Sequence, residues 1–400
     1  MSAVPALALD QRIALPDDHE LATLIGRAWL PGPLPGPSPV LILGGSAFDL
    51  SQVAPTCADL VNSDDPVGIV TGAVKSGRAP AIGRVVDMLA NSDADRRDTN
   101  RPYFLSPVDL QAVRACGVTF IASMLERVIE EQAKGDPTAA EAIRDSLGKE
   151  MGGELRAIKP GSPEAARLKD SLMRRDMWSQ YLEVGIGPDA EVFTKAQPLS
   201  AVGTGAEIGI LASSSWNNPE PELVLVVNPA GKLVGVTLGN DVNLRDFEGR
   251  SALLLGRAKD NNASCALGPF IRLLDQRYGV DDVRRTQIQV RISGIDGFEV
   301  EGSYSLAQIS RDPLELAAQT LNRNHQYPDG LALFMGTAFA PVQDRDEPGH
   351  GFTHKLGDVV TVRSPTLGAL SNRINYCDRI AAWTFGLSQL MRNLSARGLI

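Results

Sequence analysis

Residues 220–246, EPELVLVVNPAGKLVGVTLGNDVNLRD, are the stretch that decides the fold. Two apolar runs rich in valine and leucine flank Asn228-Pro229-Ala230-Gly231, and this turn sequence predicts a tight β-hairpin. Glu220 and Glu222 are two residues apart at the start of the first strand, so both carboxylates point to the same face. Asp241 ends the second strand, which returns to the same end of the hairpin. The hairpin therefore brings three carboxylates together.

The convergence of three carboxylates predicts a binding site for a hard divalent cation. Like charges held this close are costly unless a cation lies between them. Oxygen ligands suit magnesium, manganese or calcium, and we expect Glu220, Glu222 and Asp241 to bind one of these ions, magnesium before the others. The simpler alternative is that Glu220 and Glu222 form the solvent face of an amphipathic strand, because two glutamates at this spacing are common.

The rest of the sequence predicts an α+β protein that is mainly β and has two domains. A chain of 400 residues is too long for one ordinary core, and 38 glycines and 26 prolines imply many turns. Short apolar runs between Pro/Gly clusters make residues 1–105 a small strand-rich domain, with a helical pattern over 79–91. Residues 106–400 form the catalytic domain, in which 138–178 are mainly helical and a β pattern starts near residue 190.

Charge and composition argue against several classes of partner. The net charge of −9, with no basic run, argues against nucleic acid. No stretch of about 18 apolar residues occurs, so no membrane span is expected, and residues 1–20 do not have the pattern of a signal peptide. The cysteines are scattered without a C-x-x-C pair, which indicates core residues in a reducing cytoplasm. They are Cys57, Cys116, Cys265 and Cys377.

A series of short motifs resembles, in the same order, those of the fumarylacetoacetate hydrolase superfamily. They are Phe193 with Lys195, Ser200-Ala201-Val202-Gly203 with Gly205, Glu220-Pro221-Glu222, Asn240-Asp241 with Arg245-Asp246, Lys259 followed by Gly268-Pro269, Gly336-Thr337, and Leu356-Gly357-Asp358. The resemblance covers roughly residues 107–375. It implies a mixed β-sandwich or roll, metal binding through the three carboxylates, and a homo-oligomer, either a dimer or a tetramer.

Within the superfamily the chain is most similar to the sugar-acid dehydratases, through residues 183–198, 239–270 and 325–341. This implies a lyase that dehydrates a 2-keto-3-deoxypentonate to 2,5-dioxopentanoate in non-phosphorylated pentose oxidation. The hydrolases of the superfamily tend to carry a catalytic histidine after the first strand of this domain, whereas residues 117–131, GVTFIASMLERVIEE, contain none. Two alternatives stay open: a metal-dependent hydrolase of 2,4-diketo acids, and a non-catalytic protein that binds a metal ion and a keto acid.

The chemistry of dehydration needs a base and an acid, and the sequence offers candidates for both. Lys259 is the first candidate for the base, with a pKa lowered by desolvation; the alternative is an ordinary surface lysine. Glu130 or Glu131, on an amphipathic helix, is the candidate acid, presented from a closing lid. The alternative is that both glutamates form the wet face of that helix.

Binding of the small 2-keto acid itself is expected to involve further polar residues. The guanidinium fork of Arg245 suits the substrate carboxylate, and the alternative is a structural ion pair with Asp246 or Glu248. Thr337 is expected to donate a hydrogen bond to the same carboxylate. Two more candidates for substrate contacts are Lys195 and His325.

Overall fold

The computed structural model describes most of the chain, and two β-sheets define its fold. The described residues are 5–134, 136, 138–140, 143, 158–174, 178–346, 348 and 351–400. Part of the stretch 138–178, predicted to be mainly helical, lies outside these residues. Within them, helix α7 (Pro163–Arg174) agrees with the prediction.

The larger sheet contains the strands of the predicted hairpin near its middle. Among the described residues it has eleven strands, in the order β4 (Ala81–Arg84), β3 (Ser46–Asp49), β2 (Gly36–Leu43), β1 (Leu24–Leu30), β13 (Cys265–Leu273), β11 (Leu233–Asp241), β10 (Pro221–Val227), β16 (Leu331–Phe334), β6 (Ala112–Gly117) and β7 (Glu191–Ala196), with β5 (Tyr103–Leu105) paired to β1. All neighbours are antiparallel except β16 and β6, which run parallel.

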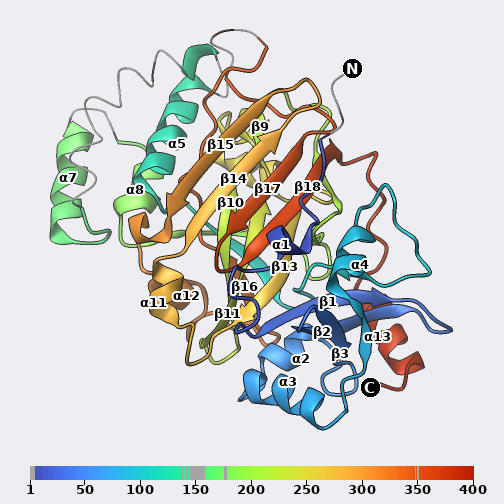
Figure 1. The fold of residues 1–400 in the computed structure, drawn as a ribbon. Helices are drawn as coiled ribbons and strands as arrows, with labels where there is room; N and C mark the ends of the chain where they lie inside the picture. Colours follow the sequence, from blue (N-terminus) through green and yellow to red (C-terminus); the bar gives the residue numbers. More distant parts are fainter. Residues whose placement is uncertain are drawn as a thin grey trace.

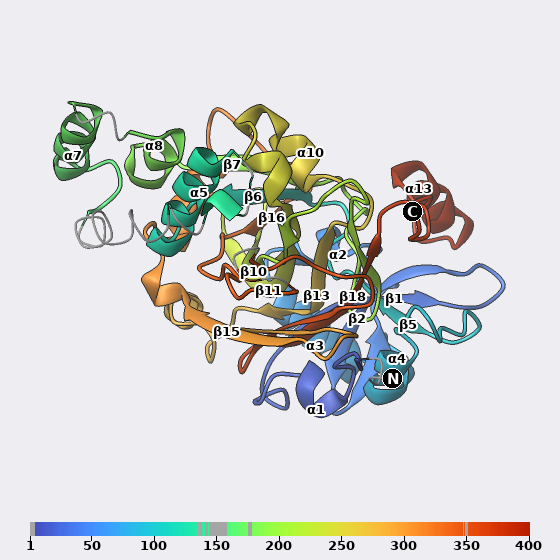
Figure 2. The same cartoon turned by 90° about the horizontal axis from the view of Figure 1, so that it is seen from above.

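The smaller sheet covers one face of the larger one. Its strands lie in the order β15 (Glu299–Ser305), β14 (Gln287–Ser293), β17 (Val359–Ser364), β18 (Gly368–Tyr376) and β8 (Glu207–Ile210). It lies in front of β10 and β13 in Figure 1, and the view from above in Figure 2 shows the two layers. A separate short ladder joins β9 (Asn217–Asn218) to β12 (Asn243–Leu244). The predicted mainly-β architecture is confirmed.

Strand β10 is buried on both of its faces, which explains why its sequence is a continuous apolar run. Leu223 and Leu225 point into the core between the sheets, where the smaller sheet contributes residues such as Val290. Val224 and Val226 point to the opposite face, into a second core. The helices α2 (Cys57–Val61) and α3 (Pro66–Lys75) cover that second core. The hairpin that carries the three carboxylates is therefore held rigidly from both sides.

Truncation of Leu225 should destabilise the protein far more than truncation of an exposed leucine. The Leu225 side chain is 0% exposed and Leu253 is 95% exposed. We expect Leu225→Ala to lower the free energy of unfolding by about 2–5 kcal/mol, because the buried methyl groups leave a cavity. Leu253→Ala should change it by less than about 0.5 kcal/mol. Urea unfolding midpoints measure both, and equal midpoints would contradict the two-sided burial of β10.

A helical cluster lies beside the sheets, next to the end of the hairpin that carries the carboxylates. It consists of α5 (Ile121–Ala133), α7 and α8 (Gln180–Ile186), whose apolar side chains form their own small core. Three short helices, α9 (Arg245–Glu248), η1 (Ala252–Leu254) and α10 (Leu255–Lys259), follow β12, and α9 contacts α5. Figure 1 shows α5, α7 and α8 together at the upper left.

The N-terminal strands continue the sheet of the hairpin. Strand β1 pairs with β13, with Leu24 opposite Arg272, so residues 1–105 share hydrogen bonds with the predicted catalytic domain. The domain boundary near residue 105 stays a prediction. The helix predicted over 79–91 is wrong in its first half, because Ala81–Arg84 pairs with β3 as strand β4; helix α4 is Val85–Ala90. A short helix, α1 (Gln11–Ala14), precedes β1.

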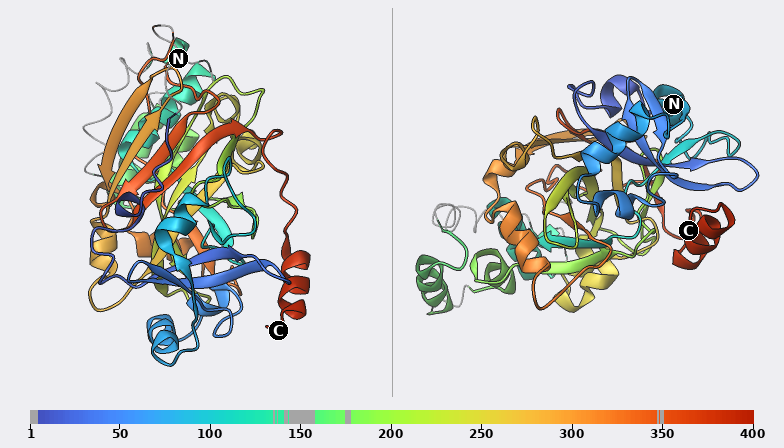
Figure 3. Two further views of the ribbon diagram at one scale, coloured as in Figure 1. Left: turned by 45° about the vertical axis from the view of Figure 1, so that its right-hand side comes forward. Right: turned by 90° about the horizontal axis from the view of Figure 1, so that it is seen from below.

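The remaining helices lie at the periphery. They are η2 (Leu306–Gln308), α11 (Val280–Arg284), α12 (Pro313–Thr320) and α13 (Leu387–Ala396). Figure 3 shows α13 beside the β1–β2 hairpin, where Arg397 donates to the carbonyl of Pro37 at 2.7 Å. Among the described residues no helix has the length and apolar character needed to cross a membrane. All four cysteines are free thiols, and three are buried, as core residues are expected to be.

Candidate metal centre

Strands β10 and β11 form the tight hairpin that the turn sequence predicts. Glu222 faces Gly239 across the antiparallel ladder, and the backbone N–H of Asp241 donates to the carbonyl of Glu220 at 2.9 Å. Glu220 and Asp241 therefore stand opposite each other at the open end of the hairpin, and Glu222 lies two residues further in. The local sequence alone sets this arrangement.

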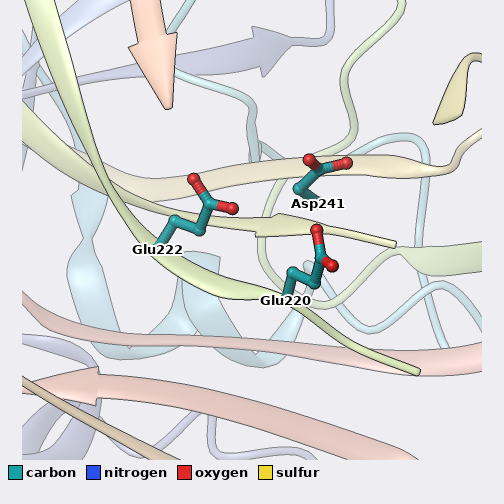
Figure 4. A group of neighbouring side chains, drawn as sticks. All are labelled: Glu220, Glu222 and Asp241. Atoms are coloured by element: carbon teal, nitrogen blue, oxygen red, sulfur yellow. The ribbon is translucent and has the colours of Figure 1, made fainter. Parts of the chain in front are cut away.

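The three carboxylates converge in the protein interior. One oxygen of each lies within 4.8 Å of the others, and Figure 4 shows the three side chains pointing toward one another. Glu220 is 5% exposed, while Glu222 and Asp241 are 1% exposed, so the alternative of a solvent-facing strand is wrong. Three buried hard oxygen donors with like charge fit a divalent cation such as magnesium.

Three basic side chains surround these carboxylates. Lys259 Nζ contacts Glu220 Oε2 and lies 3.0 Å from Asp241 Oδ2. On the opposite side, Lys195 Nζ forms an ion pair with Asp241 Oδ1 at 2.8 Å. Arg127 of α5 contacts Glu220 Oε1 through Nη2. Basic groups therefore compensate Glu220 and Asp241, but none of these contacts reaches Glu222.

The pKa shifts of Glu222 and Asp241 differ in direction, because the basic side chains described above contact Asp241 and do not contact Glu222. Burial, with Asp241 and Glu220 nearby, raises the pKa of Glu222 well above its usual range. Burial also acts to raise the pKa of Asp241, but Lys195 and Lys259 outweigh it, and that pKa is lowered. Of the two carboxyls, Glu222 is therefore the one that holds its proton to higher pH, and a cation that binds it competes with that proton.

Lys259 is at the site, but its pKa is not shifted as the sequence suggests. The side chain is 2% exposed, so the alternative of a surface lysine is wrong. Burial acts to lower the pKa of Lys259, as expected, but Asp241, Glu220 and Glu248 outweigh burial and raise the pKa. The predicted lowering is therefore wrong for this arrangement, since adjacent carboxylates stabilise the ammonium form.

Arg245 and Glu130 lie behind the site and are paired with each other. Arg245 Nε donates to Glu130 Oε1 at 2.6 Å, and its Nη2 lies 3.0 Å from Glu126 Oε2. The Arg245 guanidinium is stacked 4.3 Å from the centre of the Trp216 ring. Glu130 is 2% exposed, so the wet-face alternative is wrong for it. Arg245 does form structural ion pairs, as the alternative states. Its partners are Glu130 and Glu126 on α5, however, and not Asp246 or Glu248.

Three other residues predicted to belong to the site do not line the small cavity beside the three carboxylates. Glu131 accepts hydrogen bonds from the side chains of Ser179 and Gln180. Lys195 is fully buried behind Asp241. His325 is exposed and lies before β16, whereas Gly336 and Thr337 follow the other end of that strand. The structure thus does not bring Glu131 or His325 to the metal site.

A cavity of about 20 Å³ adjoins the three carboxylates. Its lining includes the predicted Lys259 and Thr337 and three charged residues that the sequence analysis does not assign to the site. The described lining residues are Cys116, Gly117, Val118, Ser123, Arg127, Glu191, Phe193, Glu220, Glu222, Asp241, Glu248, Lys259, Gly336 and Thr337. The backbone N–H of Gly336 donates to Glu222 Oε2 at 2.6 Å, so the G-T motif helps to hold this carboxylate.

Glu191 is one of two acidic residues in the described cavity lining, with Glu248, that were not predicted from the sequence to belong to the site. It starts β7, opposite Gly117 of β6, and a Cβ at Gly117 would lie 1.9 Å from Glu191 Oε2. A glycine at position 117 therefore leaves the room that this carboxylate occupies. Burial, and secondly the nearby Glu248, raises the pKa of Glu191 to about 7. The only sequence signal was its position two residues before Phe193, on the same strand face.

Comparison with known proteins identifies relatives of this chain. The family model described as "Fumarylacetoacetate (FAA) hydrolase C-terminal" matches residues 179–375. The 2-dehydro-3-deoxy-D-arabinonate dehydratase of Saccharolobus solfataricus is 35% identical over 180 residues, which are 45% of this chain and 57% of that protein. The probable 2-keto-3-deoxyxylonate dehydratase of Haloferax volcanii is 31% identical over 211 residues, 53% of this chain and 68% of that protein. The match thus spans less than two thirds of the first relative.

Solved structures share the fold over nearly their whole length. A 2-keto-3-deoxy-D-arabinonate dehydratase complexed with magnesium and 2,5-dioxopentanoate superposes with a TM-score of 0.59 and 22% identity, covering 88% of this chain and 99% of that one. The apo form of a protein of the same name gives 0.59 at 20% identity, with the same coverage. The likeness confirms the fold that the sequence motifs imply.

Proposed function

The chain belongs to the fumarylacetoacetate hydrolase family, and we propose that it is a metal-dependent dehydratase converting a 2-keto-3-deoxypentonate to 2,5-dioxopentanoate. The names of both curated relatives support this reaction class. The observation that carries the proposal is the convergence of three buried carboxylates, Lys259 and Glu191 on one cavity. This set combines a metal site with a candidate base and a candidate acid.

Glu220, Glu222 and Asp241 are the residues that would hold the cation. Magnesium is supported by the donor set and by the magnesium in the structure of a similar dehydratase. A bound divalent cation supplies Lewis acidity to the carbonyl of an adjacent 2-keto acid, which makes the C3 hydrogens more acidic. The chain's own residues then bind the substrate and transfer protons.

In the proposed reaction, Lys259 takes a proton from C3. Its Nζ lies between Glu220 and Asp241, the two carboxylates that raise its pKa most. When these carboxylates are neutralised by a cation, Lys259 loses the attraction that keeps it protonated, and its amine form becomes accessible. A positioned base contributes roughly 10²–10⁴-fold to such a step.

In the proposed reaction, Glu191, which lines the cavity, protonates the hydroxyl that leaves C4. With a pKa of about 7, its carboxyl is available in the acid form near neutral pH. Loss of the C3 proton and the C4 hydroxyl releases water and leaves a C3–C4 double bond. A proton then moves from C5 to C3, which gives a C4–C5 enol. The proton of the enol hydroxyl moves to C4, which produces the C5 aldehyde and completes the conversion to 2,5-dioxopentanoate.

Product analysis tests the proposed function directly. We would incubate the protein with Mg²⁺ and either D- or L-2-keto-3-deoxypentonate, and identify the product by mass spectrometry. The expected product is a semialdehyde that has lost one water, formed with Mg²⁺ and not with excess EDTA. Pyruvate release from a 2,4-diketo acid would favour the hydrolase alternative. Keto-acid binding without turnover of any substrate would favour the non-catalytic one.

The absence of histidine from the described lining residues counts against the hydrolase. The family's hydrolases tend to place one after the first strand of this domain, where this chain has Val118 and Ser123 in the cavity wall. Assembly into a dimer or tetramer stays a prediction.

The pH dependence of turnover should show the titration of Glu191. As an acid it must be protonated, so kcat should fall as the pH rises above about 7, the pKa of Glu191. Glu191→Gln should lower kcat roughly 10²–10⁴-fold and remove this alkaline limb. Steady-state kinetics from pH 5.5 to 9 would measure both effects. An unchanged alkaline limb in the variant would assign the proton donor to another group.

A further inference from the structure

The cavity contains two basic side chains among its described lining residues, and one of them has no part in the proposed proton transfers. These are Lys259 and Arg127. Lys259 is committed to Glu220 and Asp241. Arg127 comes from α5, outside the hairpin, and its side chain is only 12% exposed. A buried guanidinium that lines the cavity beside the three carboxylates needs a physical explanation, because its desolvation is costly.

Three carboxylates bind Arg127, and only one of them belongs to the candidate metal triad. Its Nη1 donates to Glu130 Oε2 at 2.5 Å and lies 3.0 Å from Glu248 Oε2. Its Nη2 contacts Glu220 Oε1. Glu130 and Glu248 are not in the candidate metal triad, whereas Glu220 is. One end of the guanidinium is therefore anchored to the protein scaffold, and the other end is bound to a metal-ligand candidate.

We propose that Arg127 binds the carboxylate of the 2-keto acid substrate. This inference rests on the proposed function, since it assumes that a cation occupies the triad. A cation bound to Glu220 weakens the hold of that carboxylate on Nη2, while Glu130 and Glu248 keep Nη1 in place. The Nη2 donors are then available to an anion in the cavity. A guanidinium suits a carboxylate because its planar donors match the two oxygens and it stays charged at any physiological pH.

Arg245, the arginine that the sequence favours for this role, is not placed for it. Its guanidinium is covered by Trp216 and bound by Glu130 and Glu126, and it does not line the cavity. Glu130 lies between the two arginines and pairs with both. Arg245 thus acts as a positioning residue, which fixes Glu130 so that Glu130 can fix Arg127. The two arginines should respond differently to substitution.

Binding measurements on Arg127 variants test the inference without relying on turnover. The probes are Mg²⁺ alone, and pyruvate, the simplest 2-keto acid, in saturating Mg²⁺; isothermal titration calorimetry measures both. Arg127→Met should bind Mg²⁺ at least as tightly as the wild type, because a cation beside Glu220 is removed. It should bind pyruvate roughly 10–100-fold more weakly, the range for a lost charge-assisted hydrogen bond. Arg127→Lys should lie between the two.

Arg245→Lys is the matched control for Arg127→Lys. It makes the same replacement of a guanidinium by an ammonium group, at the neighbouring arginine. It should weaken pyruvate binding less than Arg127→Lys does. The inference is overturned if Arg127→Met binds pyruvate as the wild type does, or if the Arg245 variant shows the larger loss. If Arg127→Met melts before it can be titrated, wild-type affinity in Arg127→Lys overturns it equally. Failure of the Mg²⁺-loaded wild type to bind pyruvate would instead remove the proposed function, and this inference with it.

Discussion

Glu222→Gln is expected to reduce Mg²⁺-dependent turnover on the order of 10³-fold and to weaken Mg²⁺ binding. Glu222 is buried and is the one triad carboxylate that no basic side chain contacts in the interactions described above. Metal activation is worth several kcal/mol, and each 1.4 kcal/mol is a factor of ten in rate. Glutamine keeps the shape and can still accept the Gly336 N–H, so the effect reports the lost charge. Kinetics and calorimetry with Mg²⁺ measure it.

The same substitution should make the metal-free protein more stable at neutral pH. The pKa of Glu222 is raised in the folded protein by burial and by the neighbouring Asp241 and Glu220, so the folded state keeps this proton to a higher pH than the unfolded chain does. A raised carboxyl pKa means that stability is lost as the pH rises above the unfolded value. Glutamine imitates the protonated form and removes this loss. Thermal melts measure the effect: Glu222→Gln should melt at a higher temperature than the wild type in EDTA, and should gain less stability than the wild type from added Mg²⁺.

An exposed glutamate on β15 provides the matched control. Glu301→Gln removes the same charge from an exposed position that belongs neither to the triad nor to the cavity lining, and it should leave turnover and Mg²⁺ binding unchanged. Retention of wild-type turnover by Glu222→Gln would remove this carboxylate from the metal site. A loss of metal-free stability in that variant would show that Glu222 is charged before the metal ion binds.

Lys259→Met is expected to lower kcat roughly 10²–10⁴-fold while Mg²⁺ still binds, because it removes the positioned base and leaves the triad intact. Without Mg²⁺ this variant should be destabilised by about 3–5 kcal/mol, since Glu220 and Asp241 lose their shared counter-ion in the interior. Added Mg²⁺ should restore most of that stability. Thermal melts and initial rates at saturating Mg²⁺ separate the two effects.

Lys195→Met distinguishes proton transfer from simple charge balance. Lys195 pairs with Asp241 as Lys259 does, but it does not line the cavity. It should therefore cost comparable stability without Mg²⁺, yet reduce kcat less than tenfold in the Mg²⁺-loaded protein. Equal losses of kcat in the two variants would mean that Lys259 only balances charge, and the base would then have to be sought elsewhere.

The hairpin and its carboxylates could be predicted because every constraint on them is local. Asn228 turns the chain, with its side chain accepting from the N–H groups of Ala230 and Lys232, and the period of a strand places Glu220 and Glu222 on one side. Family motifs supplied Lys259, Gly336 and Thr337, which line the cavity. The predicted shift of the Lys259 pKa failed because Lys259 contacts Glu220 and Asp241 directly, and these two charges outweigh its burial.

The residues that were missed or misplaced depend on contacts between distant segments. Arg127 and Glu130 look like one polar face of a helix, but α5 turns that face toward Glu220 and Arg245, residues more than ninety positions away. Glu191 reaches the cavity because β7 pairs with β6 across from Gly117. No periodicity in the sequence reveals such pairings.

The sequence by itself determined the hairpin that carries the three carboxylates, since backbone turn chemistry and strand periodicity act over a few residues. It also determined the family, through motifs whose order survives along the chain. Only the tertiary structure decided which charges face the cavity. That choice depends on how α5, β7 and α9 are oriented around the hairpin, because the free energy of a buried charge is set by its neighbours in space and not by those in the chain.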